Sequence, residues 1–539
     1  MRAGTLPGPP RWRAARHLTG LAIVGTLAAS VLSPDLVGQR SRLTAGGRLT
    51  RVYNAILDAR FEDASSLLAT TCAVSPPRDL ADEAAPVEAC HLLEAVATWW
   101  RIEIDPENRA YDERFLRQTA RAIETIEAWT RRQPENAEAW FYLGGSYGVR
   151  AQWRVLRSER LAAARDGARI KDALERSLAI NPALRDAYFG IGLYRYLADV
   201  VSGPERLLRW LLLLPGGDRA RGLRDMLLAR AEGQLLADEA DYQLHRIYLW
   251  YEDDPGRALA LLHGLRDRHP RNPLFWQRIA EVEDVYLQDA TASRRSWDSL
   301  LDAARTGRVS EATLAENRAR LGIARQLDVT FETDAALPYL RAVIDARPAT
   351  PANAVAEAHL ALGQALDRLG RRTEAVSAYQ SARAAAPTPD PLKIAERATV
   401  GLRRAPNTAT STAYRLSLEG WRALERDELP TAARALSQAL ALRPNDLVTK
   451  FRQGRLLRAQ HREADALVLF EAVGGTNPSP PTIQAEALVD AAQLRERMGE
   501  RQRATELYRF ARAVFGADQR TIEEAQRALV RLGDTSPTR

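Results

Sequence analysis

The histidines are the side chains best suited to acid–base or metal chemistry in this chain, and their spacing supports neither. All seven are scattered, and none lies in a His-Glu-x-x-His pattern or at a Cys/His metal spacing. The sequence also lacks the glycine-rich phosphate-binding patterns and the Gly-x-Ser-x-Gly nucleophile motif. We therefore expect no catalytic, cofactor-binding or metal-binding residue, and an enzyme is the least favoured class.

A short polar turn, Gly216-Gly217-Asp218-Arg219, has two interpretations. Its backbone amides could form a nest that binds an anion ahead of a helix. The same residues could simply begin a helix, with Asp218 as the N-cap. We favour the second interpretation, because it is the ordinary use of an aspartate in this position.

The first 33 residues have the pattern of an export signal. Three arginines precede an apolar stretch over residues 18–32. Small residues lie near the end of this stretch, at 28–30, where a signal peptidase could cut. The stretch is shorter than the roughly 20 residues that span a bilayer. Residues 1–33 are therefore a cleaved signal peptide or an uncleaved signal anchor. Both alternatives place the bulk of the chain outside the cytoplasm, in the periplasm or cell envelope, either free or anchored to the inner membrane.

Cys72 and Cys90 are the only cysteines, and the 17 residues between them include three prolines. This segment reads as a loop that joins two helices whose ends could meet. In an oxidising compartment the pair could form a disulfide that contributes about 3 kcal/mol through loop-closure entropy. Two free, buried thiols are the alternative. The export signal favours the disulfide.

The composition predicts an all-α protein and argues against nucleic-acid binding. Hydrophobic residues make up 46% of the chain, and strong helix formers dominate it. Four arginines precede residue 20, and without them the net charge falls from +7 to +3 over a long chain. So weak a positive field does not indicate a nucleic-acid partner.

An internal repeat determines the predicted fold. Counted from Ala356 as position 1, the residues with a defined packing role are Gly363 at position 8, Ala375 at 20, Tyr379 at 24, Ala382 at 27 and Pro387 at 32. Positions 8 and 20 must be small where two helices cross, and the proline ends the second helix. This pattern resembles the tetratricopeptide repeat (TPR), a helix hairpin of 34 residues.

The same positions recur along the chain. The residues that we assign to packing between the two helices of a repeat are Trp140, Gly144, Gly192, Gly363, Ala375, Gly420, Ala432, Gly454, Ala466 and Ala504. We predict a right-handed α-solenoid of TPR hairpins in two blocks, 48–350 and 356–535, divided near Pro348 and Pro351. Extra residues interrupt the pattern between Tyr147 and Pro182 and again over 390–412.

The middle of the chain resembles a particular TPR family. The strings that carry this likeness are Tyr188–Tyr194, Leu207–Leu214, Gly217-Asp218-Arg219, Gly222-Leu223, Ile247-Tyr248 and Pro270-Arg271-Asn272-Pro273. They are similar to a eukaryotic family of the outer mitochondrial membrane and lipid droplets, and the resemblance implies a role at a membrane surface. The apolar segment Leu207–Leu214 is either a buried helix or a patch that faces a membrane or a partner.

These features predict a non-catalytic scaffold or adaptor of the cell envelope, which binds a partner protein or peptide in the TPR groove. Trp153, Arg150 and Arg154 are the candidate partner-binding residues, because they lie in extra sequence that the repeat does not require. Aromatic and arginine side chains are also well suited to that task. The alternative is a membrane-interface protein that docks through residues 207–214 or through an uncleaved N-terminal anchor.

Overall fold

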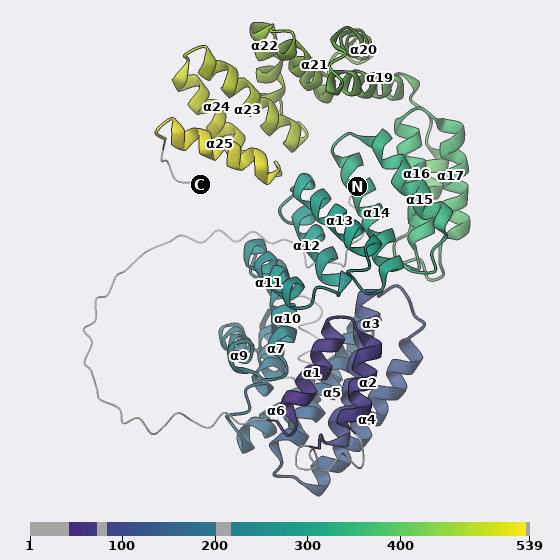
Figure 1. The fold of residues 1–539 in the computed structure, drawn as a ribbon, viewed down its shortest axis with the longest axis vertical. Coiled ribbons are helices and arrows are strands. Elements are labelled where there is room, and N and C mark those ends of the chain that lie inside the picture. Colours follow the sequence, from purple (N-terminus) through teal and green to yellow (C-terminus); the bar gives the residue numbers. More distant parts are fainter. Residues whose placement is uncertain (1–42, 73–83, 201–216, 535–539) are drawn as a thin grey trace, which may run out of the picture. The chain divides into compact units, whose positions relative to one another are not determined.

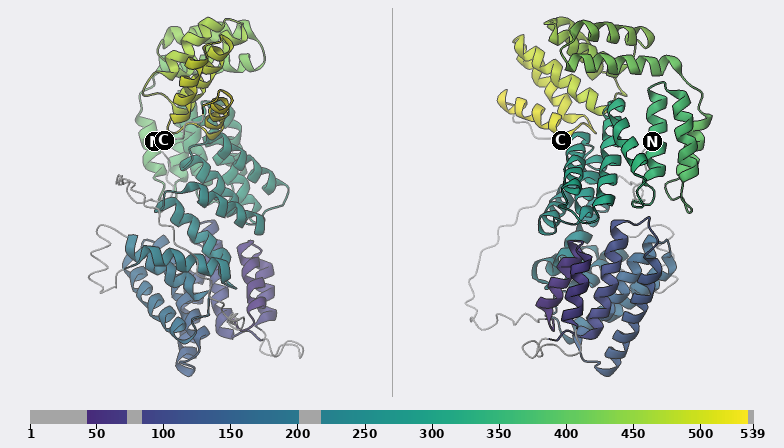
Figure 2. Two further views of the ribbon diagram at one scale, coloured as in Figure 1. Left: turned by 90° about the vertical axis from the view of Figure 1, so that its left-hand side faces the viewer. Right: turned by 45° about the vertical axis from the view of Figure 1, so that its right-hand side comes forward.

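The computed structural model describes residues 43–72, 84–200 and 217–534, and every secondary-structure element in these ranges is a helix. Figures 1 and 2 show consecutive helices running antiparallel as hairpins. The prediction of an all-α solenoid is therefore confirmed. The N-terminal segment 1–33 and the apolar segment Leu207–Leu214 lie outside the described residues.

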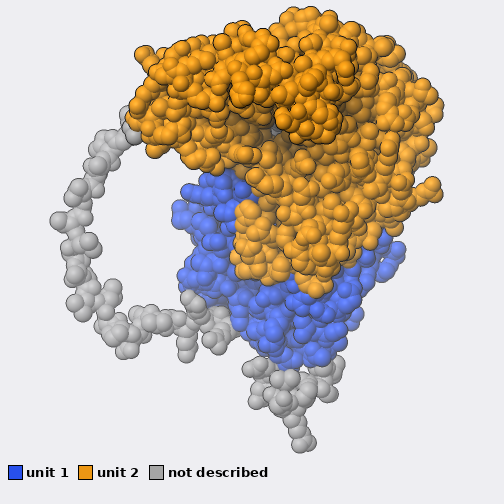
Figure 3. All heavy atoms as spheres, turned by 45° about the horizontal axis from the view of Figure 1, so that its top comes forward, with its two compact units in different colours: residues 1–261 blue, residues 262–539 orange. Residues whose placement is uncertain are grey.

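The chain divides into two compact units, residues 1–261 and 262–539, which Figure 3 colours separately. Helix α11 (Pro255–Arg268) crosses this boundary. The other helices described in unit 1 are α1 (Gly46–Leu57), α2 (Phe61–Thr71), α3 (Val87–Ile104), α4 (Asp112–Arg132), α5 (Ala137–Leu156), α6 (Arg160–Ile180), α7 (Ala187–Val200), α9 (Arg219–Glu232) and α10 (Ala237–Trp250).

Unit 2 continues the series of hairpins. Its helices are α12 (Pro273–Val285), α13 (Ala290–Arg305), α14 (Ala312–Val329), α15 (Thr333–Ala346), α16 (Ala354–Arg368), α17 (Arg372–Ala385), α18 (Ile394–Arg403), α19 (Thr408–Glu425), α20 (Leu429–Leu442), α21 (Leu447–Ala459), α22 (Glu463–Gly474), α23 (Pro481–Arg497), α24 (Arg501–Ala513) and α25 (Gln519–Arg531).

The predicted boundary near Pro348 and Pro351 needs correction, because the hydrophobic core continues across it. Val343 of α15 belongs to the same buried cluster as Ala354 and Ala358 of α16. A shared core on both sides of the two prolines makes them a connection within one unit. The division between the units falls earlier, at residue 261.

The glycines at position 8 allow the two helices of a hairpin to approach closely. A Cβ added at Gly363 would lie 2.7 Å from the ring of Tyr379, and one added at Gly454 would lie 2.7 Å from the ring of Phe470. Gly420 faces Leu436 in the same way, at 2.6 Å. Each large side chain stands at position 24 of the same repeat, so it occupies the space that a Cβ at position 8 would need.

The extra residues of the third hairpin lengthen both of its helices. Helices α5 and α6 have 20 and 21 residues, whereas α21 and α22 have 13 and 12. Each helix thus gains about two turns. The position 8 contact survives, because a Cβ on Gly144 would lie 2.6 Å from Leu174. The second insertion, 390–412, contains the extra helix α18, which packs on α16 and α17.

Aromatic residues at position 4 tie neighbouring hairpins together. The indole of Trp140 donates a hydrogen bond to the carbonyl of Pro134 at 2.8 Å, and Trp276 donates to Pro270 at 3.0 Å. The hydroxyl of Tyr188 is 3.2 Å from the carbonyl of Pro182. Trp140 is only half-buried, so its role is to fix the turn between two repeats more than to fill their core.

Two glycines one turn apart on α5 test the role of this close approach. Gly144→Ala should destabilise the protein by about 1–3 kcal/mol, because the new Cβ collides with buried Leu174. Gly148→Ala should stabilise it by about 0.5–1 kcal/mol, because no atom lies within 4 Å and alanine favours a helix. Thermal unfolding of both variants checks this, and equal changes of the same sign would contradict it.

Candidate partner-binding site

Trp153, predicted to contact a partner, lies inside unit 1. Its side chain is 6% exposed, and its ring centroid is 6.0 Å from that of Phe115. The indole nitrogen donates a hydrogen bond to the carboxylate of Asp112 at 3.1 Å. Trp153 therefore packs between α4 and the extended end of α5, and the binding role predicted for it stays a prediction.

Arg150 and Arg154 also make internal contacts. Arg150 forms two hydrogen bonds with the carboxylate of Asp166, at 2.7 and 2.9 Å, and Arg154 donates to the same carboxylate at 2.6 Å. Asp166 is fully buried. A buried carboxylate is stable only when its charge is compensated in this way. The two arginines hold the lengthened ends of α5 and α6 together, and the binding role predicted for them stays a prediction.

The structure joins Cys72, at the end of α2, to Cys90, near the start of α3, by a disulfide with a Cα–Cα distance of 6.2 Å.

The structure also distinguishes between the two interpretations of the polar turn that contains Asp218. The side chain of Asp218 accepts a hydrogen bond from the backbone amide of Arg221 at 2.8 Å and caps α9. This is the ordinary helix start that the sequence favours.

The first helix of each hairpin faces the concave side of a TPR stack, and in unit 1 this side carries a buried polar network. The hydroxyl of Tyr242 on α10 donates to Glu103 on α3 at 2.6 Å, and Arg246 pairs with the same carboxylate. Gln243 reaches Gln152 on α5 at 3.1 Å. Three first helices, α3, α5 and α10, thus meet through their side chains.

Helix α1 adds a further side chain to this network. The hydroxyl of Tyr53 donates a hydrogen bond to Glu239 on α10 at 2.9 Å, and both residues are buried. Burial raises the pKa of Glu239 above its usual range, and burial followed by the charge of Glu239 raises the pKa of Tyr53. The interior of unit 1 is therefore occupied by its own first helix.

In unit 2 the turn between α14 and α15 covers part of the concave face. Arg452 of α21 donates to the carbonyl of Phe331 at 2.8 Å, and the hydroxyls of Thr333 and Tyr414 are 2.8 Å apart. Arg422 of α19 pairs with Asp334 at 3.1 Å. The turn thus lies against α19 and against Arg452 of α21.

Beyond this turn, charged side chains of α21 and α23 meet on inward repeat positions. We call Arg455, Arg458, Glu486 and Asp490 the α21–α23 cluster. Arg455 is 2.9 Å from both Glu486 and Asp490, and Arg458 is 2.6 Å from Asp490. The side chains of Arg455, Arg458 and Glu486 are 28%, 32% and 27% exposed. These three side chains therefore remain partly accessible to solvent.

Glu486 is the most perturbed member of the α21–α23 cluster. Burial raises its pKa to about 7, and the nearby guanidinium of Arg455 only partly opposes this shift. Glu486 is therefore only partly ionised near neutral pH, and an additional cation would favour its charged form. The sequence analysis did not single out this cluster. Its four members all lie on the first helices of two successive repeats, and their opposite charges could have indicated pairing there.

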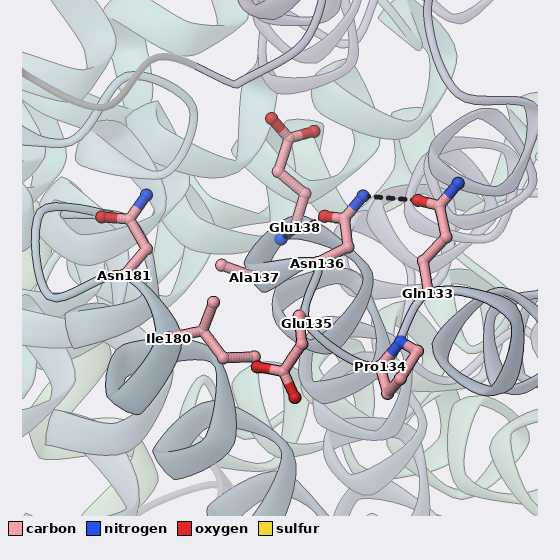
Figure 4. A pocket seen from close by; sticks show the side chains of 8 residues that line it. All are labelled: Gln133, Pro134, Glu135, Asn136, Ala137, Glu138, Ile180 and Asn181. Atoms are coloured by element: carbon pink, nitrogen blue, oxygen red, sulfur yellow. Dashed lines mark hydrogen bonds between the residues drawn. The ribbon is translucent and has the colours of Figure 1, made fainter.

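Unit 1 also has a shallow polar hollow, shown in Figure 4. Its walls are the turn between α4 and α5 and the end of α6. Asn136 donates a hydrogen bond to Gln133 at 2.8 Å, and its side-chain oxygen caps α5. These polar groups already serve the turn, so this hollow is not a candidate ligand site.

Within the described part of the chain, no cluster of three or more histidine, cysteine or acidic side chains has the arrangement of a metal site. None of its helices is both long enough and apolar enough to cross a membrane.

A family model described as a tetratricopeptide repeat matches residues 108–147 and 332–388. Together with the position 8 packing, this match shows that the chain contains tetratricopeptide repeats. A search of curated proteins finds no match.

Three solved structures illustrate the likeness of fold. A TPR protein from Parabacteroides merdae is 16% identical, with 54% of this chain and 98% of that one covered and a TM-score of 0.24. A Rap protein complexed with Competence and Sporulation Factor is 12% identical, with coverage of 90% and 99% and a TM-score of 0.24. Yeast Tom70 is 10% identical, with coverage of 90% and 96% and a TM-score of 0.24. TM-scores this low do not themselves support the fold assignment. The evidence for the fold is the family match and the packing of the helix hairpins.

The buried position of Trp153 makes it a stability residue. Trp153→Ala should lower the free energy of unfolding by about 3–5 kcal/mol, because it leaves a cavity between α4 and α5. Val155→Ala, on the same helix at an exposed position, is the control and should have little effect. Thermal unfolding distinguishes them. An unchanged melting temperature for Trp153→Ala would show that the indole is not packed as described.

The raised pKa of Glu486 predicts a pH dependence of stability. The folded state holds this proton up to about pH 7, whereas the unfolded state releases it near 4.5, so stability should fall as pH rises through this window. Glu486→Gln removes the titration and should be more stable relative to the wild type at pH 8.0 than at pH 5.5. Melting temperatures at the two pH values test this, with Glu463→Gln as an exposed control. A constant difference between Glu486→Gln and the wild type would contradict it.

Proposed function

We propose that this protein is a non-catalytic scaffold that binds a segment of a partner protein along the concave face of unit 2, at the α21–α23 cluster. One observation carries the proposal. Two successive first helices present charged side chains that are partly exposed and already held in place by one another. Such an arrangement fixes the positions of donors and acceptors before a partner arrives, which reduces the entropic cost of binding.

The cluster favours a particular partner chemistry. Arg458 keeps about a third of its side chain exposed and can accept a carboxylate in addition to Asp490. Glu486 gains from a nearby cation, because its charged form is poorly compensated by Arg455 alone. A peptide with basic and acidic side chains on one face suits both groups. Since the charged groups pair with one another and do not converge on an enclosed pocket, the arrangement favours binding over catalysis.

We also propose that the scaffold works outside the cytoplasm, in the cell envelope. The basic and apolar pattern of residues 1–33 supports export. The disulfide between Cys72 and Cys90 supports an oxidising compartment. Fractionation of cells that produce the full chain would place most of it in the periplasm or on the inner membrane, and a cytoplasmic pool with free thiols would contradict this.

Selection from a random peptide display library tests the proposed site directly. Peptides that bind the full-length protein should lose about tenfold or more in affinity to Arg458→Glu or Glu486→Gln, because each change removes one partner of a partly exposed charge pair. The matched control is the ion pair of Arg497 and Glu463 on the same two hairpins, at 3.0 Å, which lies outside the cluster. Equal losses for Arg497→Glu, or unchanged affinity for both cluster variants, would place binding elsewhere.

A further inference from the structure

Helix α1 contacts parts of unit 1 that are far away in the sequence. The amide and hydroxyl of Thr44 donate to Glu138, at the start of α5, at 2.7 and 3.1 Å. The hydroxyl of Thr50 donates to the carbonyl of Gln234, just before α10, at 3.1 Å. Together with the bond from Tyr53 to Glu239, these contacts extend across the first turns of two inward-facing helices.

The residues of α1 have the pattern of an amphipathic helical ligand. Leu49, Val52 and Ile56 lie on one face and are fully buried, while Arg51 and Asn54 on the opposite face are exposed. Spacings of three and four residues are those of a helix that lies in a hydrophobic groove. Within unit 1, α1 packs most extensively on its hairpin partner α2 and next on α3.

Two features make the fit specific. A Cβ on Gly46 would lie 2.4 Å from the side chain of Gln234, so the first turn of α1 passes very close to the segment before α10. Glu239 is buried and accepts from both Tyr53 and Gln243. If α1 left without a replacement, the carboxylate of Glu239 would lose one of its two donors. An occupant of this surface therefore needs a hydroxyl at the position of Tyr53.

We propose that the surface formed by α3 and by the first turns of α5 and α10 is a helix-binding site, and that α1 occupies it as an internal ligand. The partner that fits is an amphipathic helix with aliphatic residues at the spacing of Leu49, Val52 and Ile56 and a tyrosine that reaches Glu239. The disulfide between Cys72 and Cys90 ties the α1–α2 hairpin to α3 and so keeps the internal ligand at a high effective concentration. This site is separate from the α21–α23 cluster.

A fluorescein-labelled peptide of residues 43–59 tests the inference with the full-length protein. Fluorescence anisotropy should show no binding to the wild type, whose site is filled. Val52→Asp weakens the internal helix by placing a charge in its buried face, and this variant should bind the wild-type peptide about tenfold or more tightly than a peptide that carries the same change. Equal binding of the two peptides, or no binding of either, would overturn the proposal.

Hydrogen exchange of the unmodified protein gives a second test that does not depend on a variant. If α1 is a separable ligand, its backbone amides should exchange through a local opening that leaves α3 and α5 protected. Reduction of the disulfide should increase the exchange rate of α1 more than that of α5. If α1 exchanges only together with α3 and α5, it is an integral part of the unit and the proposal is wrong.

Discussion

The contact between a glycine in one helix and a large side chain in the next sets how closely the two helices of a hairpin approach. Gly363 with Tyr379 and Gly454 with Phe470 show the same arrangement one repeat after another. Because this contact fixes the pairing, additional residues must be accommodated away from it. Helices α5 and α6 therefore grow by similar lengths, and Gly144 still faces Leu174.

Regular pairing aligns the first helices of successive hairpins, and their inward side chains then form a continuous face. The chain covers much of this face with its own segments. In unit 1, α1 provides the hydroxyl that reaches buried Glu239. In unit 2, the carbonyl of Phe331 accepts from the buried guanidinium of Arg452. A buried charged group is expensive unless its hydrogen bonds are satisfied, so these covering segments stabilise the groups that they contact.

The sequence predicts the helix pairing well, because positions 8 and 24 are linked by local sterics within one repeat. It does not predict the contact of Trp153 with Asp112, which lies 41 residues upstream and is brought near only by the packing of α4 on α5. The pairing of Arg150 with Asp166 could more easily have been predicted from the sequence, because similar extensions of two antiparallel helices place these residues opposite each other. The contact of Tyr53 with Glu239 depends on the curvature of the whole unit, which no local pattern encodes.

At the proposed binding site, the α21–α23 cluster would couple partner binding to proton binding. Below pH 7 Glu486 carries a proton for much of the time, and a basic side chain of a partner must displace that proton before it can pair. Above pH 7 the carboxylate is already ionised, and the same pairing has no proton to displace. Affinity for a basic partner should therefore rise with pH up to about 7 and then level off. Arg458 pairs with Asp490 and not with Glu486, so its recognition of an acidic side chain does not displace this proton and does not share this dependence.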